Sequence, residues 1–156
     1  MAAKKMAIIA TKGALDMAYP PLILSSTAAA LGWEVQVFFT FYGLQLLRKD
    51  LSGIAISPLA NPAMPMPVPM PVVVAMLPGM EWMATTMMKA KMKKKGVASL
   101  EELRSVCQES DVKFIACQMT VDLFEFEKSE FIDGIEYGGA AMFLKFAGET
   151  DVCLFI

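Results

Sequence analysis

The three cysteines of this chain, Cys107, Cys117 and Cys153, are its best candidates for chemistry, because the 156 residues include no histidine. Without an imidazole, Ser-His-Asp and Cys-His catalysis and the ordinary zinc enzymes are excluded. The cysteine spacings of 10 and 36 residues fit no zinc or iron–sulfur pattern, so we expect no metal and no cofactor. An odd number of cysteines also argues against a disulfide scaffold. Reactive thiols remain.

Cys117 is the strongest candidate because of its position. It follows the apolar residues Phe114–Ala116 and precedes Gln118–Asp122, so it is expected where a strand ends and a helix starts. Backbone N–H groups at such a place lower the pKa of a thiol and hold an anion. We expect an amide-lined site that solvent reaches. The alternative is a small buried hydrophobe.

The other two cysteines have simpler explanations. Cys107 shares one face of a predicted helix with Leu100, Leu103 and Val106, which packing against a sheet explains. Its helix leads into the strand that carries Cys117, so the two thiols are able to meet within one subunit or across a subunit interface. Cys153 lies in an apolar strand and is expected in the core.

Short apolar strands that alternate with helices must position these residues. The predicted strands are Met6–Ala10, Glu34–Phe39, Val112–Cys117 and Val152–Ile156, with a turn or short strand at Ile135–Tyr137. The predicted helices are Asp16–Leu31, Tyr42–Lys49, Gly79–Lys95, Ser99–Ser110 and one that begins at Gly138. This order predicts an α/β fold with a mostly parallel sheet and helices on both of its faces.

Local signals fix several helix ends. Asp16 is expected to cap the first helix, whose regular part should begin near Pro20 and Pro21, and Gly32 is expected to end it. Ser99 and Glu102 form a capping box.

In parallel α/β sheets, ligands bind beyond the carboxyl ends of the strands. The three such places are Thr11–Gly13, Phe39–Phe41 and Cys117–Met119. The candidate substrate-binding residues are therefore Lys12, Gly13, Gln118 and Met119. Lys12 would help electrostatically if the end of the first strand faces Cys117.

A Pro/Met-rich insertion occupies about residues 51–80. The stretch from Leu51 to Met80 has no charge, and it is longer than the roughly 20 residues that span a bilayer. Seven prolines within it argue against a membrane-spanning helix, and Asn61–Pro71 should run as polyproline II. We expect no transmembrane helix and no signal peptide, hence a soluble cytoplasmic protein of one domain over residues 1–156, with peripheral membrane contact left open.

The charge and the methionines bear on partners. Fourteen basic and sixteen acidic residues nearly cancel, which disfavours a nucleic-acid binder. Nine of the 14 methionines lie between Met64 and Met92, and they suit an adaptable contact surface or, at Met64, Met66 and Met70, a Cu(I) site. The lysines at 89–95 suit a solvated helix end or an anionic partner.

Four strings together resemble the DsrE/DsrF-like proteins, in the branch with a Pro/Met insertion that is often labelled "peroxiredoxin family protein". They are Asn61–Pro67, Met87–Val97, Ala116–Met119 and Ile132–Ala140. The peroxiredoxin label is set aside, because Ile115–Met119 lacks the proline- and threonine-containing motif of a peroxidatic cysteine.

The resemblance implies a five-stranded α/β/α domain that assembles into trimers or hexamers. It also implies a sulfur carrier or sulfurtransferase that accepts sulfane sulfur or thiosulfate on Cys117, with Cys107 as the second cysteine of this branch. Rhodanese-like and TusA-like proteins are the implied partners. The alternatives are a non-catalytic assembly subunit that binds a membrane or a partner protein, and a Cu(I)-binding protein.

Overall fold

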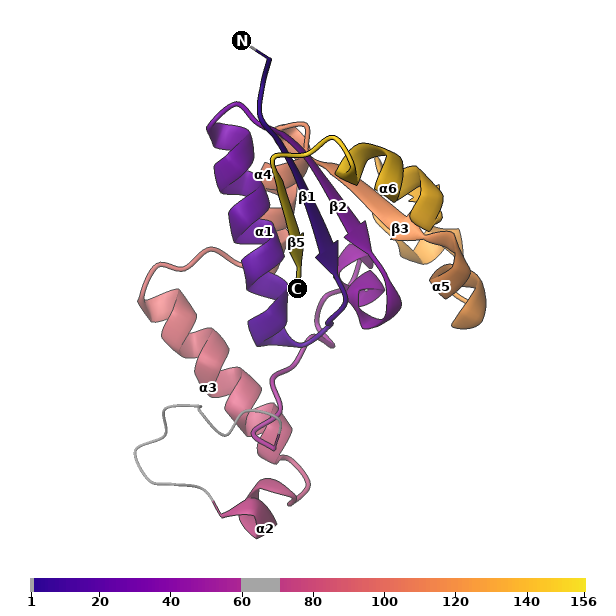
Figure 1. Cartoon of the computed structure of the whole chain (residues 1–156). Helices are drawn as coiled ribbons and strands as arrows, with labels where there is room; N and C mark the ends of the chain where they lie inside the picture. Colours follow the sequence, from indigo (N-terminus) through magenta and orange to yellow (C-terminus); the bar gives the residue numbers. More distant parts are fainter. Residues whose placement is uncertain (1, 60–70) are drawn as a thin grey trace.

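The computed structural model describes residues 2–59 and 71–156 and places a five-stranded, all-parallel sheet at the centre (Figure 1). The order of strands across the sheet is β4-β3-β2-β1-β5. The strands are β1 (Lys5–Ala10), β2 (Glu34–Phe39), β3 (Lys113–Cys117), β4 (Glu136–Gly138) and β5 (Val152–Phe155). The predicted α/β class is confirmed. Of the turn or short strand predicted at Ile135–Tyr137, the structure has the strand, which is β4.

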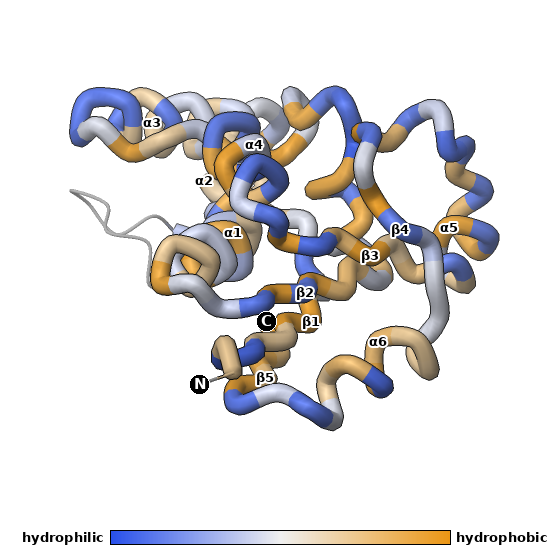
Figure 2. The backbone as a smooth tube through the Cα atoms, turned by 90° about the horizontal axis from the view of Figure 1, so that it is seen from above, coloured by the Kyte–Doolittle hydropathy of each residue, from blue (hydrophilic) through white to orange (hydrophobic). Residues whose placement is uncertain are grey.

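Helices cover both faces of the sheet, as the three-layer prediction requires. Figure 2 shows α1 (Leu15–Ala30) and α4 (Leu100–Glu109) on one side and α6 (Ala140–Ala147) on the other. Because side chains alternate along a strand, the core divides in two. The larger cluster lies under α1 and α4, and the smaller one joins Phe38 and Ile115 to Phe143 and Phe146 of α6.

The start of α1 differs from the prediction, and its end agrees with it. Ala14 is the N-cap, with no capping side chain, so the expected cap at Asp16 is wrong. The N–H of Leu15 donates instead to the carbonyl of Ala55 at 2.9 Å, and this backbone partner lets the helix begin before the two prolines. Gly32 ends the helix with a φ of +80°, which a glycine adopts without strain.

The short helix predicted at Tyr42–Lys49 is the 3-10 helix η1 (Phe41–Leu47), which ends before Arg48 and Lys49. Gly43 explains the tight path. A Cβ atom at this position would lie far inside van der Waals contact with the Ala10 carbonyl oxygen of β1. Arg48 then leaves the helix and pairs with Glu130 at 3.2 Å. The buried guanidinium of Arg104 donates to the carbonyls of Leu46 at 2.8 Å and Arg48 at 2.6 Å, which fastens η1 to α4.

Two helices stand between η1 and α4, namely α2 (Val72–Ala75) and α3 (Met80–Lys94). Figure 1 shows them extending away from the sheet on the α1 side. The Thr85 hydroxyl accepts a hydrogen bond from the N–H of Ile56 at 3.0 Å, and Ala84 is buried, so α3 is fastened to the body. The capping box of Ser99 and Glu102 is present at the start of α4. The polyproline II prediction falls almost wholly on 60–70, outside the described residues.

None of the helices in residues 2–59 and 71–156 has the length and apolarity that crossing a membrane requires.

α5 (Gln118–Leu123) and the 3-10 turn η2 (Lys128–Glu130) complete the chain between β3 and β4. α5 follows β3 without a loop, so Cys117 is both the last residue of the strand and the N-cap of the helix.

Candidate functional site

Cys117 lies where the sequence predicts, at a strand end that is also a helix start. Its side chain belongs to the smaller core cluster, together with Ile115, Phe143 and Phe146. The residue is only 5 % exposed, so the expectation of a solvent-reachable thiol is wrong for this conformation. The packing of α6 against this face of the sheet is the physical reason.

Polar groups nevertheless surround the Cys117 sulfur. Burial acts to raise the pKa of the thiol, but hydrogen bonds from the Thr120 hydroxyl and N–H, the Thr40 hydroxyl and the Met119 N–H outweigh burial and leave that pKa below its ordinary value of 9.0. These groups favour the thiolate, which is the nucleophilic form of cysteine.

Neighbouring groups orient the two threonines. The hydroxyl oxygens of Thr40 and Thr120 are 3.1 Å apart, and the N–H of Phe41 donates to the Thr120 hydroxyl at 3.2 Å. Each hydroxyl has one proton, so when one threonine donates to the other, only the second donates to the sulfur. Phe41 holds a φ of +48°, which is unusual for a residue with a side chain and costs about 1–3 kcal/mol. The strained residue therefore lies at the site and supports Thr120. Thr40 lies in Phe39–Phe41, one of the three places where the sequence predicts ligand binding beyond a strand end. No sequence pattern points to Thr120.

Replacing Thr120 with valine is expected to raise the pKa of Cys117, because burial remains while a hydroxyl donor is lost. The rate of Cys117 alkylation by iodoacetamide, followed from about pH 6 to about pH 10, should rise with a midpoint below 9.0 in the wild type. The midpoint should move up by about one pH unit or more in Thr120→Val. Thr120→Ser keeps the hydroxyl and is the matched control. Equal midpoints in both variants would contradict the assignment.

Cys107 lies on the opposite face of the sheet from Cys117. It is 0 % exposed in the larger cluster, and its thiol donates to the carbonyl of Leu22 at 3.4 Å. Burial raises the pKa of this thiol to about 11. The sequence left open whether the thiols of Cys107 and Cys117 meet within one subunit or across a subunit interface. Within one subunit they do not meet in this conformation.

The raised pKa of Cys107 predicts a loss of stability in alkali. Between the ordinary value of 9.0 and the folded value, the unfolded chain releases a proton that the folded protein retains, so the free energy of unfolding falls as pH rises. Replacing Cys107 with alanine should remove about 1 kcal/mol of this fall between about pH 8 and about pH 10. Urea unfolding at both pH values measures it. Val106→Ala, on the same helix, is the control and should keep the full pH dependence.

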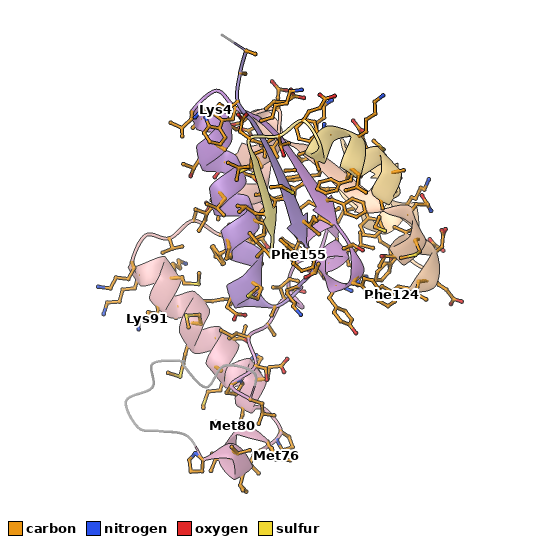
Figure 3. All side chains as sticks on the ribbon, in the orientation of Figure 1. Lys4, Met76, Met80, Lys91, Phe124 and Phe155 are labelled. Atoms are coloured by element: carbon orange, nitrogen blue, oxygen red, sulfur yellow. The ribbon has the colours of Figure 1, made fainter. Side chains whose placement is uncertain are left out.

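Cys153 is exposed, and the expectation that it lies in the core is wrong. β5 is an edge strand whose residues alternate between half-buried and exposed. Cys153 and Phe155 share the face on which α6 lies, because their register partners Ala7 and Ile9 pack in the smaller cluster, but α6 does not cover these two side chains. Phe155 is 75 % exposed as a result, and Figure 3 shows its side chain at the sheet's edge.

Two of the predicted substrate-binding residues, Lys12 and Gly13, lie apart from Cys117. They line a cavity of about 620 Å³ whose other lining residues are Ala14, Asp16, Met17, Tyr42 and Gln45. β2 separates the ends of β1 and β3, which places these ends about 10 Å apart. The structure therefore does not bring Lys12 to Cys117.

Gln118 and Met119, the other two predicted substrate-binding residues, form the start of α5 directly after Cys117. The side-chain amide of Gln118 donates to Asp122 at 2.7 Å. Met119 contributes its N–H to the sulfur, while its own side chain is 62 % exposed.

An aromatic group that no sequence pattern predicts adjoins this end of the sheet. Tyr42 stacks on Phe124 with a centroid distance of 6.0 Å, and Phe41 meets the same ring edge-on at 6.4 Å. Phe41 and Tyr42 of η1 and Met119 and Leu123 of α5 are all exposed. Because η1 contacts α5, whose N-cap is Cys117, we call these four residues the apolar rim. Figure 3 shows Phe124 at this end. Sequence spacing alone does not pair residues 41–42 with residue 124.

Metal binding receives no support from the described residues. In residues 2–59 and 71–156, no group of three or more cysteine, aspartate or glutamate side chains is placed to hold a metal ion. Met64, Met66 and Met70, the residues of the Cu(I) alternative, lie outside the described residues.

Comparisons with known proteins extend over the whole chain. Residues 2–155 match the DsrE/DsrF/DrsH-like family. The chain is 67 % identical over 160 residues to the sulfur carrier protein DsrE2 of Allochromatium vinosum, with 100 % of both chains covered. It is 34 % identical to the uncharacterized protein YrkE of Bacillus subtilis, with 98 % of this chain and 97 % of that one covered. The crystal structure of the ychN protein from E. coli shares the fold, with a TM-score of 0.56, 11 % identity and coverage of 98 % and 99 %.

Proposed function

Because the chain belongs to the DsrE/DsrF/DrsH-like family, we propose that it is a sulfur carrier that accepts sulfane sulfur on Cys117 and passes it to a partner protein. The name of the Allochromatium vinosum relative supports the carrier role. The observation that carries the assignment to Cys117 is the set of hydrogen bonds from Thr120, Thr40 and Met119, which lowers the pKa of its thiol despite burial.

The transfer chemistry needs only a thiolate and a leaving group. The Cys117 thiolate attacks the sulfane sulfur of thiosulfate, the sulfur–sulfur bond breaks, and sulfite leaves with its electron pair. The product is a persulfide on Cys117. A thiolate of the acceptor then attacks the outer sulfur, and Cys117 leaves as a thiolate. The groups that stabilise the free thiolate favour this second step as well, because a lower pKa makes a better leaving group.

Partner proteins are expected to approach over the apolar rim. Phe41, Tyr42, Met119 and Leu123 are exposed beside a sulfur that bulk solvent barely reaches, which favours delivery from a docked protein. Rhodanese-like and TusA-like carriers in the cytoplasm are the partners that we propose. Sulfur acceptance is assigned to Cys117 alone, since Cys107 is sealed in the other half of the core.

A homo-oligomer, a trimer or hexamer, is also part of the proposal. The uncovered face of β5, with Phe155 and Cys153 exposed, supports contact with another copy. This face and the apolar rim are separate surfaces, so assembly leaves room for a partner at Cys117.

Mass spectrometry of the reduced full-length protein tests the carrier function. The protein is incubated with thiosulfate, with tetrathionate, or with a rhodanese that carries a persulfide, and its peptides are then mapped. We expect sulfur, or a thiosulfonate group from tetrathionate, on the peptide that contains Cys117. An unmodified Cys117 with every donor would reject the proposal. It would favour the alternative, a non-catalytic assembly subunit in which the cysteines only pack.

A further inference from the structure

The segment between η1 and α4 exposes apolar side chains away from the sheet. They form what we call the α2–α3 tip: Val72, Val73, Val74, Met76, Leu77, Trp82, Met83 and Met87. Trp82 is 72 % exposed. Figures 1 and 3 show α2 and the start of α3, around Met76 and Met80, at the far end of the projection from the sheet. Exposed apolar surface that is this concentrated marks an interaction site.

The charge of this segment differs from that of the rest of the chain. Residues 51–98 contain five lysines and one carboxylate, that of Glu81, whereas the other residues contain nine basic and fifteen acidic side chains. The five lysines are Lys89, Lys91, Lys93, Lys94 and Lys95, and all are exposed. Within the described part of the chain, none of them forms an ion pair. The projection is therefore cationic and the body is acidic.

The apolar and basic residues share the outer side of α3. Ala84 and Thr85 are buried toward the body. Trp82 and Lys93 are eleven residues apart, about three helical turns, so they lie on nearly the same side of the helix. The outer side runs from Trp82, Met83 and Met87 to the lysines of the last turn.

From this arrangement we propose that the α2–α3 tip docks on the surface of a bilayer that contains anionic lipids. The valine side chains of α2, with Met76 and Leu77 directly after it, enter the boundary between head groups and acyl chains. Trp82 lies at head-group depth, where tryptophan is enriched. The lysines reach the lipid phosphates with their long stems along the apolar surface. A nucleic acid or an acidic protein would use the lysines but leave the exposed valines of α2 without a partner. The docking is independent of the chemistry at Cys117.

Vesicle binding by the full chain tests this proposal. The chain has two tryptophans, so Trp33→Phe leaves Trp82 as the only indole. With vesicles of phosphatidylglycerol and phosphatidylcholine, Trp82 emission should shift to the blue, and brominated acyl chains should quench it. Vesicles of phosphatidylcholine alone should bind the protein far more weakly. Co-sedimentation of the unmodified protein with the same vesicles repeats the measurement without any substitution.

Two matched lysine variants distinguish an effect of the lysines near the α2–α3 tip on vesicle binding from an effect of the protein's overall charge. Converting Lys89, Lys93 and Lys94 to glutamine should weaken vesicle binding about 100-fold, since each lysine near an anionic surface contributes about a factor of five. The control converts the exposed Lys49, Lys113 and Lys145 of the body and should bind as the wild type does. Four results would overturn the proposal: no binding to anionic vesicles, equal loss in both variants, binding to heparin but not to vesicles, or a blue shift without lipid that tracks protein concentration. The last result would assign the tip to a second copy. Failure of sulfur loading would leave the lipid result unaffected.

Discussion

Replacing Cys117 with serine is expected to lower sulfur loading of the native protein by at least about 100-fold with every donor. A serine hydroxyl is not ionised at neutral pH and forms no persulfide. The change replaces one sulfur atom with an oxygen atom at a site that Thr40 and Thr120 already hold in place, so the fold should persist. Intact-mass spectrometry after incubation with thiosulfate or a loaded rhodanese measures the effect.

The two remaining cysteines supply the controls. Cys153→Ser removes the exposed thiol and should leave loading at Cys117 unchanged. Cys107→Ala removes the buried thiol and should likewise retain loading, once the urea midpoint shows that the variant is folded. Loading that survives in Cys117→Ser and disappears in Cys153→Ser would transfer the acceptor role to the edge strand.

Replacing Gly43 with alanine is expected to destabilise the protein by about 3 kcal/mol or more. The added Cβ atom would overlap the carbonyl group of Ala10, which is backbone of the inner strand β1 and has little freedom to move. The same carbonyl accepts the N–H of Thr40 at 3.1 Å, so the change also disturbs the loop that carries a hydrogen-bond donor to Cys117. Urea unfolding followed by circular dichroism measures the loss.

Gly53→Ala is the matched control, because a Cβ atom there meets no atom within 4 Å. It should change the free energy of unfolding by less than about 0.5 kcal/mol. If Gly43→Ala does not accumulate as folded protein while Gly53→Ala does, the clash is supported. An unchanged urea midpoint in Gly43→Ala would show that β1 and η1 separate without cost.

Local sequence patterns predicted most of the framework. The strands, the capping box at Ser99 and the stop at Gly32 were predictable because a few neighbouring residues determine each of them. The start of α1 was not, because the N–H of Leu15 is satisfied by Ala55, which is forty residues away. The close approach of η1 to β1 was not predictable either, because it brings Gly43 against the carbonyl of Ala10, a residue far away in the sequence.

The candidate site was predictable in place but not in composition. The strand-end rule located Cys117, Thr40 and Phe41, since parallel strands end at one edge of the sheet. It did not reveal that α6 covers Cys117, that Thr120 faces Thr40, or that β5 leaves Cys153 open. These features depend on how the helices pack against the sheet, and hydrophobic periodicity does not predict the position of a helix over particular strands.

The placement of the three thiols has a consequence for redox behaviour. The sheet separates Cys117 from Cys107. Cys153 lies on β5, three strands from β3, and its register position corresponds to Lys113, four residues before Cys117. Strand spacing and rise together place Cys153 roughly 20 Å from Cys117. A disulfide requires Cα atoms within about 7 Å. If Cys117 carries a persulfide, as we propose, no thiol of its own chain is placed to resolve it, and we expect its sulfur to be discharged only to a thiol of another chain or molecule.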